Sequence, residues 1–325
     1  MMTTNHHSSY EEHPHRVLAT IALAPLQGRR FQPASYANLG PALFTTPDGL
    51  RCLQIDGHAA VANWLEATGW NDNRDQPHPV LEGLPFVRVT DGERPLTSSR
   101  TDSHRLASAY VLNAKTAQGQ EFRARFVEEC GLMPERPIDW ERVARVCFRY
   151  DPLALLHGVF FSQGTKKEKP IPGNPKFARI VSGFVEAEEV LPASRGGLRA
   201  DRVAPGKSEG RTAEQGYGHV PLPITDDYTA GRITLYWSLD RAALWATRLP
   251  EPARQLLERI GQWQLRRLVD APIKPRTFCD LIARSPDGLP PADKLAAAIR
   301  EGIEVCAGLG LFADPRETVV TWASP

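Results

Sequence analysis

Alternation of apolar and polar positions is the most regular pattern in this chain, and it predicts β-strands. The clearest case is residues 231–240 (GRITLYWSLD), in which Ile233, Leu235, Trp237 and Leu239 fall on one face. Residues 16–25 (RVLATIALAP) are apolar on both faces, as expected of a central strand. We predict further strands at 85–89, 153–161, 175–190 and 317–323, a loop or hairpin at 40–55, and a hairpin joining 162–176 to 177–187.

Helical spacing of apolar residues is found in other segments. In residues 250–270, Leu256, Leu257, Ile260, Trp263 and Leu268 share the face that should point inward. Further helices are predicted at 56–70 with Asp56 as N-cap, at 136–152 with Asp139 as N-cap, at 291–308, and after the loop that begins at residue 97. Helices and strands interleave without a regular βαβα order, so the predicted fold class is α+β.

A long basic excursion separates two of the predicted strands. Between 175–190 and the turn and strand at 216–240 lies SRGGLRADRVAPGKSEGRTAEQ, which has no apolar period. Its cations are Arg195, Arg199, Arg202, Lys207 and Arg211. Such a segment is typical of a finger that reaches out of a domain to contact a polyanion. A flexible linker would have the same composition, and that alternative stays open.

The composition changes this picture only slightly. The 325 residues are enough for one large or two ordinary domains, and the net charge of +1 gives no global signal for a polyanion. Of the 39 basic residues only eight are Lys, and Arg is the cation best suited to phosphate and to stacking on bases. Five Cys without metal-binding spacing fit a reduced cytoplasm, and no apolar run is long enough to span a bilayer.

The first 15 residues (MMTTNHHSSYEEHPH) are polar and lack the apolar region of a signal peptide. We expect them to form a disordered tail. The tail contains four His that could bind a metal, but solvated side chains are the simpler interpretation: His6, His7, His13 and His15.

No common catalytic motif is present. The sequence has no Walker loop, G-x-G-x-x-G, G-x-S-x-G, H-E-x-x-H or zinc spacing. Asp226 and Asp227 are better explained as turn caps than as metal ligands, and His157 lies in an apolar run typical of a core histidine. We therefore expect a binding protein rather than an enzyme, with no metal and no cofactor.

Several motifs occur together in a specific order. They are LQGRRFQP (26–33), GHAAVANWLEA (57–67), LTSSRTDSHRL (96–106), DPLALLHGVFFS (151–162), ARIVSGFVEAEEV (178–190), GYGHVPLPITDDYTAGRITLYWSLD (216–240) and RTFCDL (276–281). With this ordered set the chain resembles the backbone subunit of type I CRISPR surveillance complexes, the Cas-seven family of Cascade. The resemblance is greatest to subtype I-G, formerly I-U, and extends from about residue 17 to 285.

The resemblance implies a ferredoxin-like, RRM-like palm with helical finger insertions and a long thumb loop. It places a single domain at 16–325, with the finger insertion at about 70–150 and the thumb at about 191–216. It implies a non-catalytic cytoplasmic subunit that polymerises along the CRISPR guide RNA and presents it to target DNA. The implied partners are guide RNA, copies of itself, a Cas-five/Cas-six type fusion, a large subunit and a recruited helicase-nuclease, with no membrane.

The expected RNA-binding residues lie in these motifs. They are Arg29, Arg30, Gln32, Ser98, Ser99, His104, Arg105, Arg179, Ser182, Arg195, Arg199, Arg202 and His219. Lys166, Lys167 and Lys169 are possible nucleic-acid contacts or a solvated hairpin tip. Ser182 stands where some related backbone proteins have His. Arg179 and Ser182 differ by three positions on a predicted strand and should face opposite sides, so at most one of them is expected to face the RNA.

Two other classes of function remain open. Backbone subunits of type III complexes resemble this fold and cleave RNA with a loop Asp, for which Asp48 or Asp56 are the candidates here. A protein–protein scaffold that binds no nucleic acid is the other class.

Overall fold

One long antiparallel sheet organises the molecule. The computed structural model describes residues 8–36, 39–162, 170–199, 220–276, 279–286 and 288–322. The strands of the main sheet follow the order β16 (Ile273–Arg276), β17 (Cys279–Ala283), β2 (Arg16–Pro25), β15 (Arg232–Asp240), β12 (Val181–Glu188), β5 (Arg51–Asp56), β4 (Gly40–Thr45) and β3 (Ser35–Tyr36). β1 (Ser9–His13) also pairs with β2.

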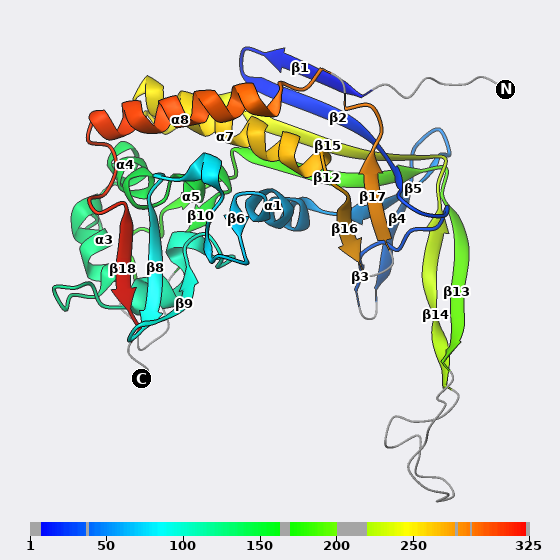
Figure 1. Ribbon diagram of the computed structural model, residues 1–325, viewed down its shortest axis with the longest axis horizontal. Helices are drawn as coiled ribbons and strands as arrows, with labels where there is room; N and C mark the ends of the chain where they lie inside the picture. The colour runs from blue at the N-terminus through cyan, green and yellow to red at the C-terminus, as the bar shows by residue number, and fades with distance from the viewer. Residues whose placement is uncertain are drawn as a thin grey trace, which may run out of the picture.

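Alternating side chains divide this sheet into a buried face and an open face. The four apolar residues predicted for one face of β15 are all buried, while Tyr236 and Ser238 on the other face are half-buried. Helices α1 (His58–Ala67), α7 (Glu251–Val269) and α8 (Ala292–Gly308) lie along one side of the sheet (Figure 1). The five inward residues predicted for the long helix are all buried in α7, and the α+β class is confirmed.

Gly183 in β12 permits the close approach of α1 to the sheet. A Cβ at this position would lie 2.9 Å from Cγ1 of Val61 and 2.8 Å from the Tyr236 carbonyl oxygen. Real Cβ atoms do not approach this closely, so a side chain here would displace α1, which also supplies His58 to the site described below.

A second group of elements lies at one end of the sheet, on the left in Figure 1. It contains η2 (Arg105–Ala107), α2 (Ala109–Asn113), α3 (Phe122–Cys130), α4 (Trp140–Tyr150) and α5 (Pro152–Leu156). It also contains a three-stranded sheet in the order β18 (Glu317–Thr321), β8 (Phe86–Asp91) and β9 (Arg94–Ser98). The segment predicted as a finger insertion therefore pairs with a strand from the C-terminal part of the chain.

The short elements of this end complete the fold. They are β6 (Trp70–Asn71), β7 (Gln76–Pro77), η1 (Pro79–Leu81), β10 (Val159–Phe160), β11 (Lys176–Phe177) and α6 (Arg241–Ala246).

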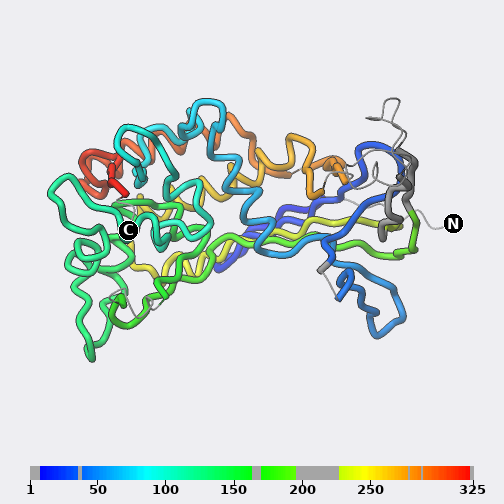
Figure 2. Tube along the Cα trace, turned by 90° about the horizontal axis from the view of Figure 1, so that it is seen from below, coloured from blue at the N-terminus to red at the C-terminus, as the bar shows by residue number. Residues whose placement is uncertain are grey.

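A β-hairpin projects from the opposite end of the sheet. β13 (Leu191–Arg199) and β14 (Val220–Thr229) pair antiparallel from Leu191↔Thr229 to Arg199↔Val220. Figure 1 shows it extending beyond the sheet, and Figure 2 shows the strands of the main sheet running from the second group of elements towards the opposite end. The sequence predicts an excursion at this position, and the described part of that excursion is a two-stranded ribbon.

Several local predictions are wrong. Residues 9–13 of the predicted disordered tail form β1, because their backbone completes the hydrogen bonding of the edge of β2. Residues 153–161 are not one strand. Asp151 accepts a hydrogen bond from the Leu153 amide at 3.0 Å and caps α5, and a turn then leads to β10. The hairpin predicted for 162–187 involves only β10 and β11, since β12 pairs with β15 and β5.

Asp56 is not the N-cap of α1. The cap is Gly57, which makes no side-chain bond, and Asp56 ends β5 with only 5% of its surface exposed. Its carboxylate accepts a hydrogen bond at 2.8 Å from Arg276, which lies 220 positions later. That distant ion pair, rather than capping, determines the position of Asp56.

Candidate nucleic-acid interface

A cavity of about 640 Å³ lies between α1, η2, the β10–β11 hairpin and the start of β12. Its lining is His58, Ser103, His104, Arg105, His157, Gly158, Val159, Phe160, Ser162, Lys176, Phe177, Ala178, Arg179 and Ser182. We call it the cationic groove. It has three permanent cations, three His and no carboxylate among its described lining residues, which is the charge pattern of a site for an anion.

The groove brings together four residues that the sequence predicted as RNA contacts: His104, Arg105, Arg179 and Ser182. The premise that Arg179 and Ser182 face opposite sides of one strand is wrong, because both line the groove. Arg179 precedes β12, which begins at Val181, so the alternation of strand side chains does not apply to it. Arg179 is exposed, and Ser182 is half-buried with its Oγ 3.1 Å from Oγ of Ser238.

The backbone at Gly158 allows Arg179 to lie against the groove wall. Gly158 has a φ of +83°, and a Cβ at this position would lie 3.0 Å from the Arg179 amide nitrogen. Only glycine combines this left-handed conformation with such a close approach. The LLHGVF segment thus has a conformational role that its apolar pattern did not indicate.

A buried ion pair with Glu66 holds the Arg105 side chain in place. Its Nε and Nη2 donate to the two carboxylate oxygens of Glu66 at 2.5 and 2.7 Å, and its Nη1 donates to the Gly158 carbonyl at 2.8 Å. Only 7% of Arg105 is exposed, and its φ of +55° is uncommon for a residue with a side chain. Burial raises the pKa of Glu66, and the Arg105 guanidinium opposes that rise. Arg105 therefore positions the groove wall more than it offers a free cation.

His104 and His58 are the exposed histidines of the groove. The His104 backbone amide donates to Asp102 Oδ1 at 2.7 Å, which fixes the loop while the imidazole remains exposed. The His58 ring lies edge-on to Phe184, with centroids 5.3 Å apart. Phe184 in turn stacks on Tyr236 at 5.1 Å on the open face of the sheet, so aromatic surface continues from the groove onto the sheet.

His157 is fully buried at the base of the groove. Its Nε2 forms a hydrogen bond of 3.0 Å with the side-chain amide of Gln264. Burial, reinforced by the nearby Arg105, lowers the pKa of His157 well below its ordinary value. The interpretation of His157 as a hydrogen-bonded core histidine is thus supported.

An aromatic and a basic side chain, Phe160 and Lys176, lie opposite each other on β10 and β11 at the rim of the groove. Phe160 is 52% exposed, and the Lys176 ammonium lies 5.5 Å from its ring centroid. Exposed aromatic rings beside cations suit single-stranded nucleic acid, since bases stack on the rings while phosphates meet the charges. Sequence reasoning missed Lys176, Phe160, His58 and Ser103. His58 lies inside a motif that carries the resemblance, but nothing in the chain alone separated it from its neighbours.

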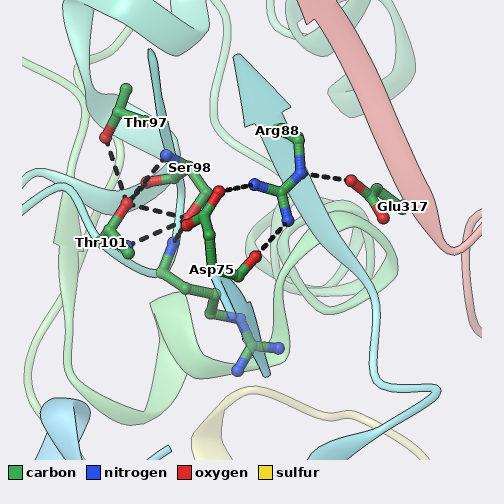
Figure 3. Close-up of polar contacts among 7 residues, drawn as sticks. Asp75, Arg88, Thr97, Ser98, Thr101 and Glu317 are labelled. Atoms are coloured by element: carbon green, nitrogen blue, oxygen red, sulfur yellow. Dashed lines mark hydrogen bonds and ion pairs between the residues drawn. The ribbon is translucent and has the colours of Figure 1, made fainter. Parts of the chain in front are cut away.

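Ser98 and Ser99 do not reach the surface, contrary to their predicted RNA contacts. Both are 1% exposed. Oγ of Ser98 lies 3.0 Å from Oγ1 of Thr101 and accepts from the Thr101 amide, within the polar cluster of Figure 3. Ser99 accepts from the Val87 amide at 3.1 Å and hydrogen-bonds the Asp151 carboxylate. These hydroxyls hold β9 and its loop in place.

The same region contains three more ion pairs. The buried Arg88 bridges two solvent-accessible carboxylates, Asp75 at 2.6 Å and Glu317, which ties β18 to β8 (Figure 3). Arg100 pairs with Asp151 at 2.8 Å, and burial raises the pKa of that carboxyl group while Arg100 opposes the rise. The Arg100–Asp151 pair ties the loop that leads to His104 to the start of α5.

Arg29, Arg30 and Gln32 lie elsewhere, at the base of the β13–β14 hairpin. Nη1 of Arg30 donates to the Ser194 carbonyl at 2.8 Å, and the buried Phe31 exchanges two backbone hydrogen bonds of 2.9 Å with Tyr228. Arg29 is exposed and Gln32 is half-buried. The eight residues of β12 separate this cluster from the cationic groove by roughly 25 Å.

The remaining predicted contacts are only partly described. Arg195 and Arg199 lie on β13 opposite Thr225 and Val220. Arg202, His219, Lys166, Lys167 and Lys169 lie outside the described residues, so their predicted roles stay predictions.

Neither candidate for a catalytic Asp lies in a metal cluster. Asp48 is in the exposed β4–β5 turn, where its hydrogen bond with Thr46 lowers the pKa of the carboxyl group. Asp56 is paired with Arg276. In the described part of the chain no group of three or more His, Cys, Asp or Glu could hold a metal ion. Among these residues, too, no helix has the length and apolar character needed to cross a membrane.

Comparisons with known proteins give a match to a family model and matches to solved structures. A family model described as "CRISPR-associated protein GSU0053" matches residues 17–192, more than half of the chain and the whole lining of the cationic groove. Comparison with curated proteins gives no match. Among solved structures, a chain of a "CRISPR RNA-guided surveillance complex, pre-nicking" is similar, with 11% identity, a TM-score of 0.38, and coverage of 82% of this chain and 73% of that chain.

Proposed function

We propose that this protein, which belongs to the CRISPR-associated GSU0053 family, is a non-catalytic subunit that binds the guide RNA of a type I-G interference complex. Membership confirms the resemblance to CRISPR-associated proteins that the ordered motifs indicate. The subtype, the RNA ligand and the absence of catalysis are part of our proposal.

The charge of the cationic groove carries this proposal. A guide RNA has a variable sequence, so a subunit that holds it must contact phosphate and ribose without reading base edges. The groove offers Arg179, Lys176 and His104 at its surface, aromatic rings at its rim, and no opposing carboxylate in its described lining. This combination supports retention of a single strand through its backbone and through sequence-tolerant stacking.

The further parts of the proposal follow the resemblance. The long sheet would be an RRM-like palm, the β13–β14 hairpin would be the thumb, and the elements at 70–150 would be the fingers. Copies of the protein would polymerise along the guide in the cytoplasm and present it to target DNA. The Cas-five/Cas-six type fusion, the large subunit and the helicase-nuclease would complete the assembly. The five buried free cysteines suit a reducing compartment.

Size-exclusion chromatography with absorbance at 260 and 280 nm tests the proposal. Guide-length RNA should shift the wild-type protein to a large RNA-containing species, and the shift should weaken as salt increases. The Lys176→Ala/Arg179→Ala variant should lose most of this shift. Arg267→Ala, which removes an exposed cation from α7 outside the groove, is the matched control. RNA binding that is identical in all three proteins would contradict the assignment of the groove.

A type III-like ribonuclease is the alternative predicted from the sequence. The ion pair of Asp56 with Arg276 offsets the charge that a divalent metal would need, and among the described residues Asp48 belongs to no group of three or more potential metal ligands. We therefore do not favour this alternative. The assembled complex should leave bound RNA intact in the presence of Mg²⁺ or Mn²⁺.

A further inference from the structure

A second cavity, of about 560 Å³, adjoins the cationic groove. It is lined by Ile138, Asp139, Trp140, Glu141, Leu155, Lys176, Phe177, Ala178, Ile180, Ala243, Ala246, Thr247 and Arg248. Lys176, Phe177 and Ala178 line both cavities, so β11 and the residue after it form a common wall. A chain bound in the groove would therefore pass directly beside this cavity.

Trp140 gives the cavity an unusual exposed surface. It is the first residue of α4 and is 45% exposed. Exposure of the large apolar indole to water is energetically unfavourable. Phe177 supports its ring edge-on, with centroids 5.7 Å apart and an interplanar angle of 89°. Other lining residues are apolar, including Leu155 and Ile180. The indole thus offers a rigid flat face over an apolar floor.

The polar groups of the lining already have partners within the chain. Asp139 accepts from the Arg142 amide at 3.1 Å, Glu141 pairs with Arg145 at 2.8 Å, and the Thr247 hydroxyl donates to the Leu244 carbonyl at 2.6 Å. The cavity therefore has no fixed set of donors and acceptors that would select one base. Its cationic residues, Lys176 and Arg248, are exposed.

We propose that this cavity, the Trp140 pocket, binds a nucleobase of the single-stranded RNA held in the cationic groove. The base stacks on Trp140 whatever its identity, while the adjoining phosphate stays near Lys176. This inference rests on the proposed function and adds to it a stacking site. An RNA base is favoured over an apolar side chain of a protein partner because the pocket shares its cationic wall with the groove.

The test combines a protein variant with an RNA variant. Guide-length oligouridine and an abasic strand with the same phosphates are titrated against wild-type protein, Trp140→Ala, Trp140→Phe and Trp245→Ala, with fluorescence anisotropy as the readout. Trp245 is the matched control: it is 42% exposed on the nearby α6 and packs on His15, but it lines neither cavity.

We expect Trp140→Ala to weaken binding of oligouridine roughly 5- to 140-fold, the usual range for one stacked base. Binding of the abasic strand by Trp140→Ala should equal that of the wild type. Trp140→Phe should restore most of the affinity, Trp245→Ala should change nothing, and the dependence of affinity on salt should be the same for all four proteins. The number of phosphate contacts sets the salt dependence, and the variants leave that number unchanged. A loss of affinity without a change in salt dependence therefore reports stacking rather than charge.

Three results would overturn the inference. One is an equal loss of affinity for oligouridine and for the abasic strand in Trp140→Ala, because Trp140 would then contribute to binding without contacting a base. Another is unchanged RNA binding with impaired assembly, which would assign the pocket to a protein partner. If the wild type binds neither strand in a salt-dependent manner, the proposed function itself fails. Circular dichroism of each variant verifies that it is folded.

Discussion

The ion pair between Glu66 and Arg105 gives the sharpest prediction about this site. In Glu66→Ala the Arg105 guanidinium, which is 7% exposed, keeps its bond to the Gly158 carbonyl but loses its hydrogen bonds to both oxygens of the Glu66 carboxylate. An arginine cannot shed its charge. Breaking a buried pair costs about 3 to 5 kcal/mol, and the remaining carbonyl bond favours the lower end, about 3 kcal/mol.

The reciprocal variant should behave differently. In Arg105→Ala the carboxyl group of Glu66 can take up a proton, because burial raises its pKa and the opposing Arg105 is gone. The native state then binds a proton that the unfolded state releases near its ordinary pKa of about 4.3. The stability of this variant should therefore be greatest in acid and should fall as pH rises through the raised native pKa.

Urea denaturation at pH 5 and pH 8 measures both effects. With an m-value of about 3 kcal/mol/M, Glu66→Ala should lower the midpoint by roughly 1 M at either pH. Arg105→Ala should lower the free energy of unfolding less at pH 5 than at pH 8. The double variant Arg105→Ala/Glu66→Gln should show no such difference between the two pH values. The double alanine variant should cost about 2 kcal/mol less than the sum of the singles. Additivity within about 0.5 kcal/mol would refute the idea that the two residues act as a pair.

Other predictions test the groove and its surroundings. Arg179→Ala should reduce the slope of log affinity for single-stranded RNA against log salt by roughly 0.7, whereas Arg267→Ala should leave it unchanged; equal slopes would mean that Arg179 meets no phosphate. Asp56→Ala should destabilise the fold by about 1 kcal/mol in urea because the half-buried Arg276 loses its partner but can be solvated, and neither this variant nor the wild type should cleave RNA with Mg²⁺. Burial lowers the pKa of His157, so its contribution to stability is present above about pH 6.5 and is lost as the pH falls. Below pH 6.5 the wild type should lose up to about 1.4 kcal/mol of unfolding free energy per pH unit through His157, and His157→Gln should remove this loss. Identical pH profiles of thermal stability for the wild type and the variant would contradict a neutral buried His157.

Local patterns in the sequence predicted much of the secondary structure. Alternation in 231–240 and 16–25 gave strands β15 and β2, and apolar spacing in 250–270 gave α7 with its inward face. These predictions are confirmed because each depends on the repeat of a single element, which is a property of neighbouring residues. Asp139 as a cap is confirmed for the same reason, since its hydrogen bond reaches only to the Arg142 amide.

Predictions of individual contacts were less successful because each depends on a distant partner. Asp56 has the sequence context of a helix cap, but Arg276 takes its carboxylate. Ser98 and Ser99 have the context of a phosphate-binding loop, but packing of β9 against β8 buries them. Residues 9–13 have the composition of a tail, but the free edge of β2 supplies hydrogen bonds that composition cannot indicate.

The sequence by itself determined the α+β class, the position of the basic excursion and the membership of a CRISPR-associated family. Only the tertiary structure decided which side chains share a site. His58, Arg105 and the pair Lys176 and Arg179 come from three segments, and folding brings them around one cavity while Arg29 and Arg30 lie at the far end of β12. The local sequence determines local conformation. Burial and charge pairing between distant segments determine which residues remain available to a ligand.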